Sequence, residues 1–248
     1  MSEWVIGNVV QVKHWTDNLF SLIIRAPIDP FVAGQFTKLG LEINGKKIQR
    51  AYSYVNAPKN RNLEFYLIAV PGGKFSGKLH AMQPGNNLMI TKKAAGFFIL
   101  DEIPSCKYLW MLATGTALGP YLSILEQGDG LERFDKIILI HAVRFAKELS
   151  YLPQMLKLQR RFNNKLSILT IVSREINQGS LTGRIPSLIK DGSLEQAINL
   201  KLEAKNCHVM LCGNPNMVHD TQQILKETRA MQKHFKNSPG HISTEHYW

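Results

Sequence analysis

The stretch Tyr108–Pro120, "YLWMLATGTALGP", joins a nearly continuous apolar run to a glycine-containing turn. Such runs are typical of parallel strands that are buried on both faces. Similar runs follow at "KIILIHA" (136–142), "LSILTIVS" (166–173) and "HVMLCG" (208–213). Helical patterns lie between them, notably over 148–162 and 216–235. This alternation of strand and helix predicts a doubly wound α/β parallel sheet over residues 101–248.

Residues 1–100 have a different pattern. Six short β-rich runs are separated by breaks that contain Pro, Gly and Asn, and a single short helical segment, "SGKLHAM" (76–82), interrupts them. Such a series predicts a small antiparallel β-barrel. The pattern changes near residues 95–104, so we expect two domains, 1–100 and 101–248.

The chain is basic. Its formal net charge is +11, and residues 1–100 carry twelve Lys and Arg against five Asp and Glu. This charge favours an acidic partner or a phosphate-bearing ligand. The three cysteines have no CxxC spacing and the eight histidines no HxH or HExxH spacing, so we expect neither a disulfide framework nor a metal. Without a signal-peptide pattern or a long apolar run, we expect a cytoplasmic protein with no membrane span.

Small and cationic residues follow each predicted strand of the second half. In open α/β sheets, ligands bind beyond the carboxyl ends of the strands. The residues found there are "TGTALGP" (114–120), Val143–Arg144, Ser173–Arg174 and "GNPNM" (213–217). A further arginine, Arg184, comes just after the Arg174 turn. Arginines occur by chance in the loops of any basic protein, but two of them after successive strands favour a phosphate-bearing ligand. The glycines of 114–120 allow a tight turn, and the helix start there is able to receive an anion.

A second candidate cluster lies in the first half, at "KKIQRAYSY" (46–54). Strand alternation places Arg50, Tyr52 and Tyr54 on one face, where a large ligand would meet both charge and aromatic surface. The glycine turn "GGKFSGKL" (72–79) leads into the short helix, with Ser76 expected as its N-cap. A helix start beside Arg50 would form a diphosphate site. The terminal Tyr247 and Trp248 fit either a flat ligand ring or a core pocket, and His141 is expected in the core.

Together these motifs resemble the ferredoxin–NADP⁺ reductase superfamily. "RAYS" (50–53) matches its R-x-Y-S/T signature and "GKFSGKL" (73–79) its G-x-x-S/T-x-x-L motif. "TGTALGP" is similar to its nicotinamide-domain turn, and "CGNPNM" (212–217) to its late C-G-x-P motif. The resemblance runs over essentially the whole chain, and the terminal "TEHYW" is similar to the tail of the bacterial ferredoxin/flavodoxin–NADP⁺ reductases.

The resemblance implies roles for individual residues. FAD would lie against 46–54, with Arg50 and Tyr52 at its diphosphate, Ser53 near flavin N5 and Tyr66 beside the isoalloxazine. Arg144, Arg174 and Arg184 would hold the 2′-phosphate of NADPH, and Tyr247 and Trp248 would close over the FAD, Trp248 over the adenine. The implied catalytic residues are Ser53, Cys212 and Glu245, of which Glu245 is the candidate acid. The remaining implied cofactor contacts are Ala51, Leu67, Ile68, Ala69, Lys74, Phe75, Ser76, Thr116, Val143, Ser173, Asn214 and Asp220.

The implied activity is an FAD enzyme that passes electrons between NADPH, as hydride to flavin N5, and a one-electron carrier, ferredoxin or flavodoxin. The basic surface suits an acidic carrier, and we expect a monomer that binds neither nucleic acid nor membrane. A reductase of free flavins or quinones is the alternative within the same class. From another class, a basic nucleic-acid-binding module would stack bases on an exposed sheet face. That module would leave the strand-end arginines unexplained.

Overall fold

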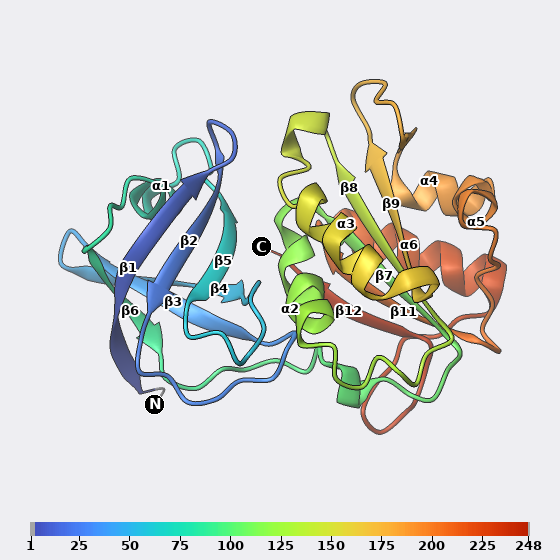
Figure 1. Ribbon diagram of the computed structural model, residues 1–248, viewed down its shortest axis with the longest axis horizontal. Helices are drawn as coiled ribbons and strands as arrows, with labels where there is room; N and C mark the ends of the chain where they lie inside the picture. The colour runs from blue at the N-terminus through green and yellow to red at the C-terminus, as the bar shows by residue number, and fades with distance from the viewer. Residues whose placement is uncertain (1–2, 248) are drawn as a thin grey trace. The chain divides into compact units, whose positions relative to one another are not determined.

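The computed structural model describes residues 3–247 and divides into two compact units (Figure 1). The first unit consists of Met1–Leu100 together with Gly119–Gly128, and the second of Asp101–Leu118 together with Asp129–Trp248. The 3₁₀ turn η1 (Leu100–Glu102) lies where the chain first passes from one unit to the other. No helix of the described residues is long and apolar enough to cross a membrane.

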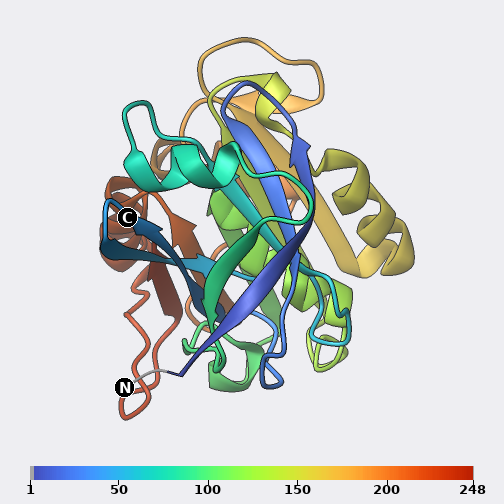
Figure 2. The same cartoon turned by 90° about the vertical axis from the view of Figure 1, so that its left-hand side faces the viewer.

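The first unit is built on a six-stranded antiparallel sheet in the order β4-β3-β6-β1-β2-β5, which curls into a half-barrel (Figure 2). This confirms the predicted antiparallel architecture. Its strands are β1 (Trp4–His14), β2 (Leu19–Arg25), β3 (Phe36–Ile43), β4 (Lys46–Ser53), β5 (Leu63–Ile68) and β6 (Asn87–Thr91). The expected short helix is α1 (Lys74–His80), which begins two residues earlier than the sequence pattern indicated.

The core of this unit follows from strand alternation. Phe20, Leu22 and Ile24 of β2 are fully buried, as are the neighbouring β5 side chains of Phe65 and Leu67. Because successive side chains point to opposite faces of a strand, residues two apart share the core face. Helix α1 covers part of this core with buried Phe75 and Leu79.

Tyr54 corrects one prediction. Strand β4 ends at Ser53, and Tyr54 is fully buried with its ring stacked on Phe31 at 3.9 Å between centroids. Its backbone N–H donates to the Gln35 carbonyl, and the next one, of Val55, donates to Glu64. Because it is fully buried, Tyr54 does not share a ligand-facing surface with Arg50 and Tyr52. It belongs to the hydrophobic core.

Helix α2 (Gly119–Gln127) follows the first strand of the second unit in sequence but packs with the first unit. The Ser123 hydroxyl donates to the Asn56 carbonyl at 2.7 Å, and the Tyr121 ring lies 5.6 Å from that of Phe98. At Gly119 a Cβ would lie 3.3 Å from the Val55 side chain, so this glycine allows close packing. A boundary placed by sequence order alone does not account for this helix.

The second unit is built on a six-stranded sheet in the order β10-β9-β8-β7-β11-β12, in which every pair is parallel. This confirms the predicted α/β class. The strands are β7 (Tyr108–Thr114), β8 (Lys136–Val143), β9 (Leu166–Val172), β10 (Ser180–Thr182), β11 (Cys207–Gly213) and β12 (Ile242–His246). The α-helices are α3 (Leu152–Arg161), α4 (Ile185–Lys190), α5 (Ser193–Ile198) and α6 (Pro215–Arg229), with 3₁₀ turns η2 (Gly115–Leu118), η3 (Ala146–Glu148) and η4 (Asn163–Lys165).

Helices cover both faces of this sheet: α3 lies on one face, and α4, α5 and α6 lie on the other (Figure 1). Strand β11 is buried along its whole length and β8 over all but its first residue. Such burial is expected for strands that have helices on both faces of their sheet. Helix α6 ends at Arg229, earlier than the predicted 235, because Ala230 adopts a left-handed conformation with φ 51°. Strand β12 was not predicted, because "ISTEH" lacks a long apolar run.

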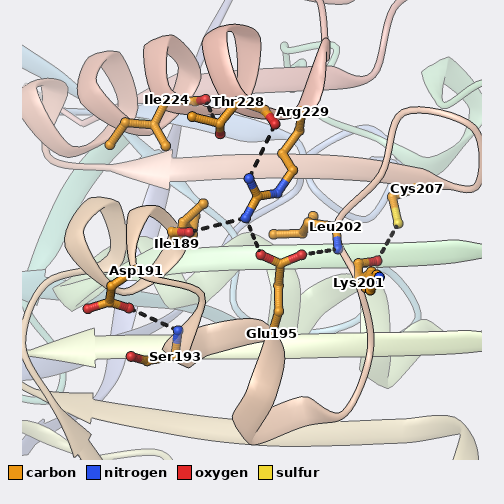
Figure 3. A network of polar contacts seen from close by, with 10 residues as sticks. All are labelled: Ile189, Asp191, Ser193, Glu195, Lys201, Leu202, Cys207, Ile224, Thr228 and Arg229. Atoms are coloured by element: carbon orange, nitrogen blue, oxygen red, sulfur yellow. Dashed lines mark hydrogen bonds and ion pairs between the residues drawn. The ribbon is translucent and has the colours of Figure 1, made fainter.

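A polar network holds the three helices of the second face together (Figure 3). The two oxygens of the Glu195 carboxylate on α5 accept from the Leu202 backbone N–H at 2.7 Å and from the Arg229 guanidinium at the end of α6. The same guanidinium donates to the Ile189 carbonyl of α4. Both charged side chains are mostly buried, with 13% of Glu195 and 24% of Arg229 exposed. The network therefore gives both buried charges a partner, without which their burial would destabilise the folded protein.

Candidate functional site

Two sequence motifs meet in the first unit. The Tyr52 ring on β4 lies parallel to the Phe75 ring on α1, with 6.4 Å between centroids and 10° between planes. Burial raises the pKa of Tyr52 to about 12, an effect opposed by the neighbouring Arg50 charge, so its phenol stays protonated and can donate. Arg50 is exposed, and no ion pair within the described residues occupies its guanidinium, which donates to the adjacent Gln49 carbonyl at 2.8 Å.

The loop before α1 is held by Ser76, although not as predicted. The N-cap of α1 is Gly73, and the Ser76 hydroxyl accepts from the Val70 backbone N–H at 3.0 Å. A Cβ at Gly73 would lie 2.9 Å from the Val70 carbonyl oxygen, so a larger residue would displace this loop. The loop brings Lys74 to the start of α1, next to Phe75. The Arg50 guanidinium, the Lys74 ammonium and the Tyr52 hydroxyl are all donors, and their chemistry fits a diphosphate.

The other candidates of the first unit differ in exposure. Ala51 is exposed, Ser53 is buried at the end of β4, and Tyr66 is buried on β5. The Leu67 side chain belongs to the hydrophobic core, so only its backbone is able to contact a ligand. Ile68 and Ala69 are partly exposed at the end of β5.

Three exposed arginines gather at the carboxyl edge of the parallel sheet, and we call Arg144, Arg174 and Arg184 the arginine cluster. They follow the ends of β8, β9 and β10, where Val143 is aligned with Val172 and Val172 with Thr182. None of the three forms an ion pair within the part of the chain that the structure describes. Three free guanidinium groups at one edge fit a phosphate.

The loops that carry this cluster are tied together. The Ser173 backbone N–H and its hydroxyl both donate to the carbonyl of Val143, and the Arg174 N–H donates to the carbonyl of Arg144 at 3.0 Å. The Arg174 guanidinium lies 5.9 Å from the centroid of the Phe145 ring. The sequence thus correctly paired Val143–Arg144 with Ser173–Arg174.

The turn after β7 is a 3₁₀ turn and carries buried Thr116. Gly115 has a φ of 55°, which explains why a glycine stands there. The buried His141 on β8 donates from Nε2 to the Gly115 carbonyl at 2.9 Å, and burial lowers its pKa to about 4. His141 is therefore a neutral core histidine, as predicted, and it also anchors this turn.

The candidates on β11, β12 and α6 have mixed roles. The Cys212 thiol is fully buried, 4.0 Å from a Glu245 carboxylate oxygen, and both features raise its pKa well above the usual range, so it stays protonated. The Asn214 side chain caps α6 by accepting from two backbone N–H groups, whereas Asp220 is exposed on the same helix. Tyr247 donates its N–H to the Gly213 carbonyl, and Trp248 lies outside the described residues.

Sequence reasoning missed two glutamates beside the arginine cluster. Glu148 and Glu175 accept hydrogen bonds from the backbone of the loop after β8. The available signal was their spacing, since Glu175 directly follows Arg174 and Glu148 comes four residues after Arg144. Among residues 3–247, no group of three or more His, Cys, Asp or Glu side chains could hold a metal ion.

Comparison with known proteins agrees with both halves of this description. Residues 11–96 match the family model of an oxidoreductase FAD-binding domain, and residues 111–223 match that of an oxidoreductase NAD-binding domain. The flavodoxin/ferredoxin–NADP reductase of Shigella flexneri is 60% identical over 248 residues, which cover 100% of both chains. The chain belongs to the flavodoxin/ferredoxin–NADP reductase family.

Two other proteins, both ferredoxin–NADP reductases, are also similar to this chain over most of its length. The ferredoxin–NADP reductase of Pseudomonas aeruginosa is 34% identical over 234 residues, 91% of this chain and 90% of that protein. The crystal structure of a ferredoxin NADP⁺ reductase from Neisseria gonorrhoeae with bound FAD and NADP has a TM-score of 0.94 at 35% identity, covering 100% of both chains. The predicted family, fold class and cofactors are confirmed, and the roles of individual residues stay predictions.

Proposed function

We infer that this protein is an FAD-dependent oxidoreductase that transfers electrons between NADPH and ferredoxin or flavodoxin. The observation that carries this inference is that each unit has its own set of cationic donors that pair with no carboxylate among residues 3–247. Arg50 and Lys74 belong to the first unit, and the arginine cluster belongs to the second. Two phosphate-binding chemistries on one chain suit two nucleotide cofactors.

We propose that residues 1–100 form the FAD-binding domain. Arg50, Tyr52 and Lys74 would bind the diphosphate, because all three donate hydrogen bonds and two of them are charged. Ser53 would lie at the reacting edge of the flavin. The supporting contacts would come from Ala51, Tyr66, Leu67, Ile68, Ala69, Phe75 and Ser76, and from the tail residues Tyr247 and Trp248.

We propose that residues 101–248 form the NADP-binding domain. The arginine cluster would bind the 2′-phosphate, which NADPH has and NADH lacks. The protonated Cys212 and the neighbouring Glu245 would lie near the nicotinamide, with Glu245 as the candidate acid. The supporting contacts would come from Thr116, Val143, Ser173, Asn214 and Asp220.

When bound, FAD supplies the conversion between a two-electron donor and a one-electron carrier. The chain's own residues bind the two cofactors, orient them and exclude water from them. We further propose that the carrier is acidic and docks on a basic surface, since residues 1–100 carry twelve cations against five anions. We also propose a monomer that acts in the cytoplasm, where free cysteines such as Cys106, Cys207 and Cys212 are usual.

An absorption spectrum of the purified protein tests this function. We expect a yellow protein with the flavin bands of one non-covalent FAD, which bleach without oxygen when NADPH is added and recover when oxidised ferredoxin or flavodoxin follows. NADH at the same concentration should bleach them far more slowly. A colourless protein that takes up no FAD, or one that NADH bleaches as fast as NADPH, would contradict the proposal.

A further inference from the structure

Three consecutive backbone N–H groups after β8 all donate to carboxylates. Glu148 Oε2 accepts from the N–H of Arg144 at 2.9 Å and from that of Phe145 at 3.1 Å. Glu175 Oε1 accepts from the N–H of Ala146 at 2.6 Å. Hydrogen bonds to ionised acceptors are shorter and stronger than neutral ones, so this loop is held unusually firmly for a surface segment.

The Glu175 contact is the one that crosses between two loops. Glu175 follows Arg174 in the loop after β9, whereas Ala146 is two residues beyond Arg144 in the loop after β8. A second link, from the Arg174 N–H to the Arg144 carbonyl, joins the same loops at 3.0 Å. The second bond is made by the backbone of the arginine pair itself, and the Glu175 bond follows it in both loops. Together they hold the two backbones that carry the pair at a fixed separation.

Neither glutamate occupies a guanidinium of the arginine cluster. Arg144, Arg174 and Arg184 have no ion pair among residues 3–247, although two carboxylates stand in the same loops. A carboxylate bound to a guanidinium would compete with an incoming phosphate for the same donors. In many NAD sites an acidic side chain instead accepts from the ribose 2′-hydroxyl. Here Glu148 and Glu175 both accept from the backbone of the loop after β8, and neither takes a guanidinium of the cluster away from a phosphate.

We propose that Glu175, supported by Glu148, is a positioning residue that presets Arg144 and Arg174 for the 2′-phosphate of NADPH. The inference rests on the proposed role of the arginine cluster and extends it to residues that do not touch the ligand. Glu175 acts through the Ala146 N–H, which holds the Arg144 loop against the Arg174 loop. Pre-arranged donors bind more tightly because less conformational freedom is lost on binding.

The charge of Glu175 and its hydrogen bond have opposite effects on a phosphate. The negative charge repels the ligand, whereas the hydrogen bond keeps the donors in place. Glu175→Gln removes the charge and retains an oxygen acceptor, while Glu175→Ala removes both. Ala146→Pro removes the N–H donor and leaves the carboxylate. Proline is tolerated there, because Ala146 is the first residue of η3 and Phe145 is already extended, with φ −127° and ψ 147°.

Calorimetric titration of the FAD-loaded protein with 2′-phospho-AMP and with AMP tests the proposal. We expect Glu175→Ala and Ala146→Pro each to weaken 2′-phospho-AMP binding by about fivefold to tenfold, consistent with one exposed hydrogen bond to a charged group. The double variant should be no weaker than either single variant, because both remove the same bond. Glu175→Gln should stay within about twofold of wild type or bind more tightly. AMP affinity should be the same in all of them.

Glu203→Ala is the matched control, because Glu203 is a surface carboxylate that precedes β11, at the opposite edge of the sheet. It should leave both affinities unchanged. If Glu175→Ala binds 2′-phospho-AMP as wild type does, the hydrogen bond does not preset the arginines and the inference is overturned. If the Ala and Gln variants both tighten binding equally, only the charge of Glu175 matters, which also overturns it. In that case the arginine cluster keeps its role as long as wild type prefers 2′-phospho-AMP. A wild type that binds both nucleotides equally would overturn the proposed site itself.

Discussion

At the scale of single residues, Arg50 is the clearest case of a charge left available for a ligand. Arg50 and Tyr52 occupy the same face of β4, and the Tyr52 ring is fixed against Phe75. The guanidinium has no carboxylate partner in the described chain, although it stands on a strand that also carries Lys46 and Lys47. Repulsion among these cations is offset when an anion binds.

We predict that Arg50→Ala weakens FAD binding by roughly 1.5–3 kcal/mol, the usual contribution of a hydrogen bond to a charged group. Arg50→Lys should lose less, because it keeps the charge without the planar fork. Flavin fluorescence during dilution measures the dissociation constant. Arg61→Ala, a change of another exposed arginine in the same unit, should bind FAD as wild type does. FAD retention in Arg50→Ala equal to wild type would remove this residue from the diphosphate site.

Two buried histidines predict acid sensitivity. Burial lowers the pKa of His141 to about 4 and that of His208 to about 3, the latter helped by the charges of His234 and His241. In the unfolded chain both have the ordinary pKa of about 6.5 and bind protons more readily than in the folded protein. Their contribution to stability is therefore complete above pH 6.5 and is lost as the pH falls toward 4.

Urea unfolding with excess FAD at pH 7, 6 and 5 measures this loss. We expect the free energy of unfolding to fall by up to about 1.4 kcal/mol per pH unit for each buried histidine. His141→Gln, which keeps a donor for the Gly115 carbonyl, should reduce the slope. His219→Gln, on the exposed side of α6, serves as the control for replacing a histidine. An unchanged slope in His141→Gln would show that His141 is not the group that titrates.

At the scale of elements, the contacts of Glu195 and Arg229 join α4, α5 and α6 into one layer (Figure 3). We predict that Arg229→Met destabilises the protein by about 1–3 kcal/mol, because it leaves the mostly buried Glu195 carboxylate without its cation. Lys226→Met removes the same charge from an exposed position on the same helix, and it should destabilise the protein much less. Thermal unfolding with FAD saturating compares the two. Equal losses in both variants would assign the effect to the helix end and not to the network.

At the scale of the whole molecule, the excess of positive charge bears on the encounter with the electron carrier. Opposite charges speed association more than they tighten the final complex. The Debye length falls from about 10 Å at 0.1 M salt to about 3 Å at 1 M, so added salt should suppress the encounter. With NADPH saturating and the carrier limiting, we expect electron transfer to ferredoxin or flavodoxin to slow steeply with salt. Reduction of a small uncharged acceptor should change little. Equal salt responses for the two acceptors would contradict electrostatic docking.

The sequence by itself determined the fold class and the location of most candidate residues. The runs at 136–142 and 208–213 predict buried parallel strands, because a sheet with helices on both faces needs apolar residues on both faces. The pairing of Arg144 with Arg174 followed from the same pattern, since parallel strands place their carboxyl ends at one edge. These features are local periodicities, which the order of residues records directly.

Only the tertiary structure decided the contacts made between segments distant in sequence. The burial of Tyr54 depends on Phe31 and Phe65, and the packing of α2 with the first unit depends on Asn56 and Phe98. Strand β12 exists because β11 offers a free edge to "ISTEH", a segment with little strand signal of its own. The use of Glu148 and Glu175 on the backbone also escaped the sequence, because a glutamate looks the same whether it pairs with a guanidinium or a peptide N–H. Which partner it takes is set by the geometry that the fold imposes on both loops.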